Sequence, residues 1–288
     1  MTTNTAGGTL NIAIGNYAGD SITSADDNTL VGHTAGSAIT TGVANTFIGQ
    51  EAGLLTVGGT SNTALGNLAL RNNSGASNNV AIGREALEDN TTADYNVAIG
   101  SYALQKNTTG AQNIAIGGQA ADANTTGTRN IAIGYTAYSA SDTENDNLAI
   151  GYAAMITNTA GGTKNIAIGN YALDALTSGD TNVAVGYDAM TLHTTGANNV
   201  AVGERALAAS TAGAQNTAIG GTALIATTTG SNNTAVGYAS LGANTTGADN
   251  IAIGVNALGA NTTGVDSVAV GTDAVSYTHL TLPTNREV

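Results

Sequence analysis

A five-residue pattern of polar and apolar positions, Asn–aliphatic–Ala–Ile–Gly, recurs along the chain, for example at residues 113–117. The residue before the glycine is Ile, Val or Leu in all sixteen copies. The residue before that is Ala in fourteen copies, with Leu30 and Phe47 as the exceptions. Of the fifteen steps between successive motif glycines, fourteen span 17 residues and one, from Gly151 to Gly169, spans 18. The motif glycines are Gly15, Gly32, Gly49, Gly66, Gly83, Gly100, Gly117, Gly134, Gly151, Gly169, Gly186, Gly203, Gly220, Gly237, Gly254 and Gly271.

This period predicts an all-β fold, a parallel β-solenoid. Seventeen residues are too few for a propeller blade or a helix pair, which need about 33 to 50. Glycine and β-branched residues in every repeat disfavour a long helix. We expect each repeat to form one coil of two short strands and two turns, with coils stacked about 4.8 Å apart. Sixteen coils would cover residues 11–275, after a partial repeat at residues 1–10.

Stacking turns each position of the repeat into a ladder along the axis. Asn stands four residues before the motif glycine in fifteen copies, which predicts side-chain amide hydrogen bonds from coil to coil. The motif glycine predicts a positive φ or a close approach to the neighbouring strand. The frequent Asn-Thr-Thr-Gly segments predict turns in which the glycine takes the strained conformation.

The strand pattern is apolar on both faces. Ile114 and Ile116 point one way, while Ala115 and Gly117 point the other. Such a strand is normally buried on both sides, although a single coil has only one interior. Either face could line that interior and the other could meet another chain, which favours a homo-oligomer, with a trimer as the natural closed form. The alternative is a monomer whose second face is covered by the Ala-Leu segment of the same coil.

Composition and charge exclude several classes of protein. The chain has no Cys, so it has no disulfide and no Cys ligand or nucleophile. The net charge is −13, and the seven basic residues are scattered, which argues against a nucleic-acid partner. No apolar run approaches the ~18 residues of a membrane span. The first ten residues lack the basic and apolar regions of a signal peptide.

The repeat, together with the Ala three residues after the glycine, resembles the head repeats of trimeric autotransporter adhesins. The longer unit, as in residues 233–247, resembles the repeat regions of phage tail-fibre and related bacterial surface proteins still more closely. The resemblance implies a left-handed β-roll, three chains side by side, and a structural or adhesive fibre on a virion or a bacterial surface. It does not identify a receptor.

Both ends of the sequence depart from the complete repeat. Residues 4–11 match residues 158–165, so the chain opens in the middle of a repeat. The tail at residues 276–288 fits no position of the repeat and holds the only proline. It looks like translated adapter sequence of the kind found in metagenomic reading frames, the alternative being a short genuine cap. We expect it to be poorly ordered.

No set of residues predicts a catalytic, cofactor or metal site. His33, His193 and His279 occupy different positions of the repeat, and Ser and Thr lack a paired His and Asp. Asp249 and Asp266 would stack, but two carboxylates are too few for a calcium site of the repeat type, which needs an acid in every coil. Turn charges that favour solubility explain these acids better.

The sequence offers two candidate binding surfaces. Tyrosines recur at the two variable positions after the motif glycine, where variability indicates solvent exposure, so they are candidate contacts for a glycan or a partner, although scattered surface tyrosines are the simpler interpretation. These residues are Tyr102, Tyr135, Tyr152, Tyr171, Tyr187 and Tyr238. The rival is an ice-binding solenoid that displays ranks of Thr. Against it, the commonest Thr pair is adjacent, as in Thr245-Thr246, so the two side chains would not share one flat face.

Overall fold

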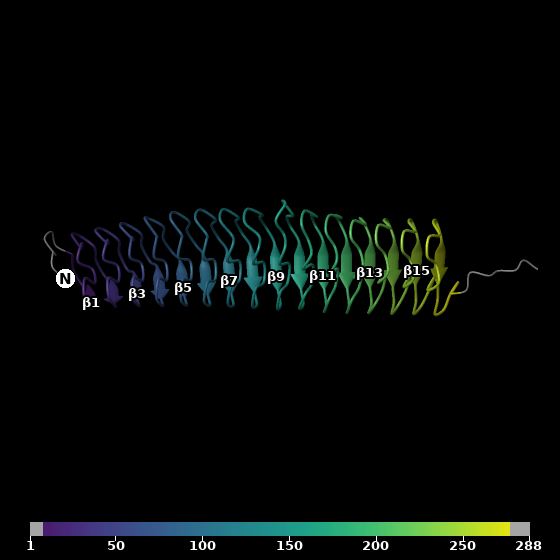
Figure 1. The fold of residues 1–288 in the computed structure, drawn as a ribbon, viewed down its shortest axis with the longest axis horizontal. Helices are drawn as coiled ribbons and strands as arrows, with labels where there is room; N and C mark the ends of the chain where they lie inside the picture. Colours follow the sequence, from purple (N-terminus) through teal and green to yellow (C-terminus); the bar gives the residue numbers. More distant parts are fainter. Residues whose placement is uncertain (1–7, 277–288) are drawn as a thin grey trace, which may run out of the picture. The chain divides into compact units, whose positions relative to one another are not determined.

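The computed structural model describes residues 8–276. The chain divides into two compact units, one ending at Ser178 and one beginning at Gly179, and each is a parallel β-solenoid (Figure 1). The predicted fold class is therefore confirmed. The tail lies outside the described residues, apart from Ser276, and so does the expectation about its order.

Each strand is three residues long and sits at the predicted motif. The first unit holds β1 (Ile12–Ile14), β2 (Thr29–Val31), β3 (Thr46–Ile48), β4 (Thr63–Leu65), β5 (Val80–Ile82), β6 (Val97–Ile99), β7 (Ile114–Ile116), β8 (Ile131–Ile133), β9 (Leu148–Ile150) and β10 (Ile166–Ile168). The second unit holds β11 (Val183–Val185), β12 (Val200–Val202), β13 (Thr217–Ile219), β14 (Thr234–Val236), β15 (Ile251–Ile253) and β16 (Val268–Val270).

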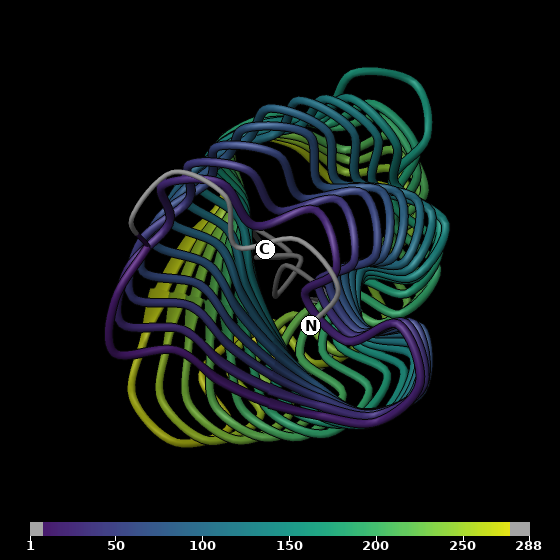
Figure 2. The ribbon, with the colours of Figure 1, turned by 90° about the vertical axis from the view of Figure 1, so that its left-hand side faces the viewer.

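Within each unit, every strand pairs in parallel and in register with the next. In β6 and β7, for example, Ala98 lies opposite Ala115. The 18-residue step does not disturb this register, because Leu148 of β9 still pairs with Ile166 of β10. The extra residue is absorbed in the turn after β9, the turn that protrudes beyond its neighbours in Figures 1 and 2.

The expectation of two strands per coil is wrong, because each coil has one strand and the rest is turns and bends. The reason is the backbone of the second segment. The second and fourth residues after the motif glycine, such as Tyr102 and Leu104, have φ values of 64° and 50°. This left-handed conformation interrupts an extended strand, but hydrogen bonds between coils continue, as from Leu104 N to Ala120 O at 3.0 Å.

The middle residue of each strand, here called the strand-centre position, points into the coil. From β2 onward it is buried in both units, whereas the flanking strand residues are half-buried or exposed. The Ala face therefore lines the interior and the Ile/Val face lies outside, which settles the choice that the sequence left open. The Ala-Leu segment also belongs to the interior: Ala103 and Leu104 are fully buried, as are Ala98 and Ala115.

The motif glycines meet both physical conditions that the sequence predicted. Gly66 has a φ of +144°, and a Cβ added to it would lie 2.7 Å from the carbonyl carbon of Gly83. A side chain at this position would thus be strained and would collide with the next coil.

The Asn before each strand, here called the strand Asn, forms the predicted ladder. Asn45 is fully buried, and its side-chain Nδ2 donates to Asn28 Oδ1 at 3.0 Å and to Gly59 O at 2.8 Å. Its backbone N donates to the same Asn28 Oδ1 at 2.9 Å. Each amide therefore ties two coils together and satisfies a buried carbonyl.

The prediction for the Asn-Thr-Thr-Gly turn is wrong in one respect: its glycine is not in a left-handed conformation. Gly110 is needed for space, since an added Cβ would lie 2.5 Å from Asn107 Oδ1 and would collide with Gly127 O. Its carbonyl accepts from Asn96 Nδ2 and Asn107 Nδ2, both at 2.9 Å. The turn Asn thus forms a second buried ladder, as from Asn124 Nδ2 to Asn107 Oδ1 at 2.8 Å.

Candidate functional site

The outward strand face is an apolar strip. In β1–β10 every outward strand residue is Ile, Val, Leu or Thr, and the same holds in β11–β16. Ile48 and Leu65 are 38% and 45% exposed, and Ile219 in the second unit is 41% exposed. Ten strands about 4.8 Å apart and three residues wide give a face of about 500 Å². That area is at the upper end of the apolar patches, about 300–600 Å², that monomeric proteins leave uncovered.

The predicted tyrosine contacts lie on the outside of the coils, as the variability of their positions indicated. Tyr135, Tyr152, Tyr187 and Tyr238 are exposed, while Tyr102 and Tyr171 are half-buried. In the first unit the structure brings three of them together. Tyr135 and Tyr152 stack with centroids 5.9 Å apart, and Tyr152 and Tyr171 meet edge to face at 5.4 Å.

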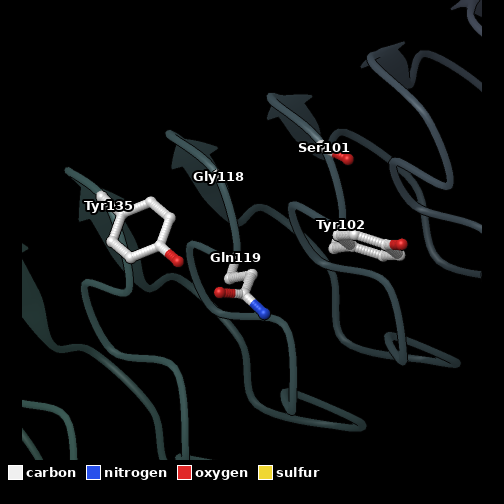
Figure 3. Close-up of a pocket in the computed structure, with 5 residues that line it drawn as sticks. All are labelled: Ser101, Tyr102, Gly118, Gln119 and Tyr135. Carbon is white, nitrogen blue, oxygen red and sulfur yellow. The ribbon is translucent and has the colours of Figure 1, made fainter.

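Tyr102 lies two coils before Tyr135, and a groove of about 270 Å³ separates them. Ser101, Tyr102, Gly118, Gln119 and Tyr135 line it, and the Gln119 side chain lies between the two phenol rings (Figure 3). The groove exists because Gly118 has no side chain: an added Cβ would lie 3.3 Å from Tyr135 Cδ2. Arg84 stands with its Cζ 4.5 Å from the centroid of the Tyr102 ring.

Sequence reasoning missed Arg84, Ser101, Gly118 and Gln119 because it examined the tyrosines one by one. The signal was available: a Gly at the first variable position is followed 17 residues later by Tyr. The same pair occurs in the second unit, where a Cβ on Gly221 would lie 3.4 Å from Tyr238 Cδ2. There Arg205 occupies the place that Tyr102 has in the first unit.

His193 and Tyr138 are buried, have shifted pKa values, and stand at interior positions that other residue types occupy in most coils. His193 stands in the turn Asn position, fully buried; its ring nitrogens lie 2.9 Å from Gly196 O and 3.1 Å from Ser210 Oγ, and burial lowers its pKa. Tyr138 is buried beside Asn147, whose Nδ2 donates to its hydroxyl at 2.8 Å, and burial raises its pKa. Both are enclosed in the core, so neither faces a ligand.

Glu144 fills the position where most coils have Gly or Ala. Its carboxylate accepts from the backbone N of Asp142, Thr143 and Gly161, each at 3.1 Å. It thereby holds the turn that carries the extra residue, which is a structural role.

The histidines and acids are not brought together into a site. His33 is exposed and meets the Tyr17 ring at 6.2 Å, His193 is in the core, and His279 is outside the described residues. Within residues 8–276 no three His, Cys, Asp or Glu side chains gather as a metal site would require, and no helix could cross a membrane.

The two residues of a Thr-Thr pair differ in their contacts and exposure. In Asn107-Thr108-Thr109 the Thr108 hydroxyl donates to Thr125 O at 3.0 Å, while Thr109 is exposed. Because Asn107 is fully buried, this glycosylation sequon is inaccessible in the folded coil.

Comparison with protein-family models and with curated protein sequences gives no match. The strip and the groove are therefore interpreted from their own geometry and chemistry.

Proposed function

We propose that this chain is a shaft segment of an extracellular fibre, either a phage tail fibre or a bacterial surface adhesin, and that three copies assemble through the apolar strip. The observation that carries the proposal is the strip itself. Each coil has a closed interior, yet an uncharged rank of Ile, Val, Leu and Thr side chains runs outward along β1–β10. Covering that rank with a second and third copy removes apolar surface from water, which favours association.

The coil-to-coil bonds suit a load-bearing shaft. The strand Asn ladder and the parallel strands both run along the axis of each unit, and each coil contacts only its neighbours. Within the described coils no three His, Cys, Asp or Glu side chains gather as a metal site would require. The function that we propose is mechanical and adhesive, and not enzymatic.

Light scattering on the purified full chain tests the assembly. We expect a mass three times 28.2 kDa. The paired variant Ile99→Lys/Ile116→Lys places charges on adjacent rungs of the strip and should yield a monomer with an unchanged circular dichroism spectrum. The control, Thr109→Lys/Thr126→Lys, places the same charges on adjacent exposed turns and should remain trimeric. A monomeric unmodified chain would refute the assembly.

A further inference from the structure

We propose that the groove between Tyr102 and Tyr135 binds one ring of a neutral oligosaccharide. The inference rests on the proposed adhesive function and names the chemical class of its ligand. It uses the side chains that line the groove in Figure 3 and the tyrosines that follow it in the next two coils.

The size of the groove fits one ring of a longer ligand. Its volume of about 270 Å³ is just below the range of about 300–1,000 Å³ typical of sites that enclose a whole small molecule. Beyond Tyr135, the rings of Tyr152 and Tyr171 continue along the next two coils at 5.9 and 5.4 Å. An extended chain of rings lying along the coils would thus find further aromatic surface.

The chemistry of the lining fits a sugar. An aromatic ring offers an apolar surface to the C–H face of a pyranose, and the phenol hydroxyl at its edge can bond to water or to the ligand. Within the described part of the chain, the side chains of Ser101 and Gln119 have no hydrogen-bond partner. An amide and a hydroxyl between two aromatic rings can donate to and accept from sugar hydroxyls.

Charge selects a neutral ligand. None of the five lining residues is ionisable at neutral pH, and the whole chain carries −13, which repels polyanions. Arg84, which lies outside the lining, already stands against the Tyr102 ring and 3.6 Å from Glu85. A phosphorylated or sulfated ligand would find no free cation in the groove.

The second unit supplies a matched control. Gly221 and Tyr238 reproduce the pair Gly118 and Tyr135, but Arg205 replaces Tyr102, so the second aromatic wall is missing. Gly118→Gln would fill the groove and leave both tyrosines in place. Gly221→Gln makes the same change at the equivalent place, and Gln50 shows that Gln is accommodated at this position of a coil.

The test is an array of neutral gluco-, manno- and galacto-oligosaccharides, with sialylated and sulfated glycans beside them, probed with the full chain. We expect binding to neutral members, weakened about tenfold or more in Tyr135→Ala and Gly118→Gln, and unchanged in Gly221→Gln. Absence of glycan binding, binding to charged glycans only, or equal binding by Gly118→Gln would overturn the proposal. So would binding to a glycoprotein that persists after its glycans are removed.

The mass of the same samples separates this proposal from the assembly. A trimer that binds no saccharide refutes the groove and leaves the fibre standing. A monomer that binds saccharide through Tyr135 refutes the trimer and leaves the groove standing.

Discussion

Two regions of the first unit fill their interior with large side chains from different positions of the coil. These regions are the coils around β2 and β3 and the coils from β4 to β7. In the first region the strand-centre residues are large, Leu30 and Phe47, and the fourth residue after the motif glycine, here called the corner position, is glycine. In the second region the strand-centre residue is Ala, and the corner position is Leu or, once, Ala. Both regions are fully buried at these positions.

Steric contact explains why a large strand-centre residue goes with glycine at the corner position. A Cβ added to Gly19 would lie 2.7 Å from Leu30 Cδ1, and one added to Gly36 would lie 2.8 Å from Leu30 Cδ2 and 3.1 Å from Phe47 Cδ2. Interiors are packed to near-crystalline density, so a side chain at the corner position does not fit beside a large strand-centre residue. In these coils the large side chain can therefore stand at the strand centre or at the corner, but not at both.

Removing the large residue without replacement should have the largest effect. Phe47→Ala leaves a cavity beside the glycines at both neighbouring corners and should lower the free energy of unfolding by about 3–5 kcal/mol. Urea denaturation followed by circular dichroism measures it. The control is Ile48→Ala on the outside of the same strand, 38% exposed in the isolated chain. Equal losses in the two variants would contradict an interior filled by Phe47.

Placing a large side chain at the corner position in place of Phe47 should restore most of the lost stability. Gly53 has a φ of +59°, close to the +54° of Leu70 at the next corner, so Leu fits the backbone there. Gly53→Leu alone would collide with the Phe47 ring and destabilise. Combined with Phe47→Ala it should be within about 1.5 kcal/mol of the unmodified chain. A double variant as unstable as the sum of its parts would show that the two positions are not interchangeable.

The two regions also show where sequence reasoning reaches its limit. Comparing repeats position by position predicted the strands, the motif glycines and the strand Asn ladder, because each depends on one position. It treated Leu30 and Phe47 as exceptions, since the compensating Gly36 stands in another position and another coil. It also could not tell the inner from the outer strand face, because both are apolar; burial of Ala98 against Ala115 decides that only in three dimensions.

The candidate site was predictable in part. The tyrosine positions are on the outside, as their variability indicated, but the groove depends on a missing side chain at Gly118. The 18-residue step between Gly151 and Gly169 was found from spacing alone. The contacts around this turn were not predicted, because Tyr138 and Glu144 make hydrogen bonds that no single position reveals.

The turn Asn position gives a second contrast between the regions, and a smaller expected effect. It is Ile22 and Ile39 in the first region, but a buried amide ladder from Asn73 to Asn124 in the second. Asn107→Ala would leave buried polar atoms of its neighbours unpaired and should cost about 1–3 kcal/mol in urea denaturation. Thr109→Ala, on the exposed side of the same turn, should change stability by less than about 0.5 kcal/mol. If Asn107→Ala is as stable as Thr109→Ala, the amide hydrogen bonds of the ladder do not stabilise the fold.

In the second unit the same turn Asn position carries His193, which should make stability depend on pH. Burial lowers its pKa below the usual 6.5, and the groups that face it, Ser210, Gly196 and Asn199, are uncharged. The unfolded chain therefore binds a proton first as pH falls. The contribution of His193 to the free energy of unfolding is complete above pH 6.5 and declines below it, by at most about 1.4 kcal/mol per pH unit.

Urea denaturation at pH 7.5, 6.5 and 5.5 should show this decline in the unmodified chain and in His33→Asn. His193→Asn, which restores the commonest residue of the ladder, should reduce it. If His193→Asn loses as much stability as the unmodified chain between pH 6.5 and 5.5, the buried imidazole is not its source.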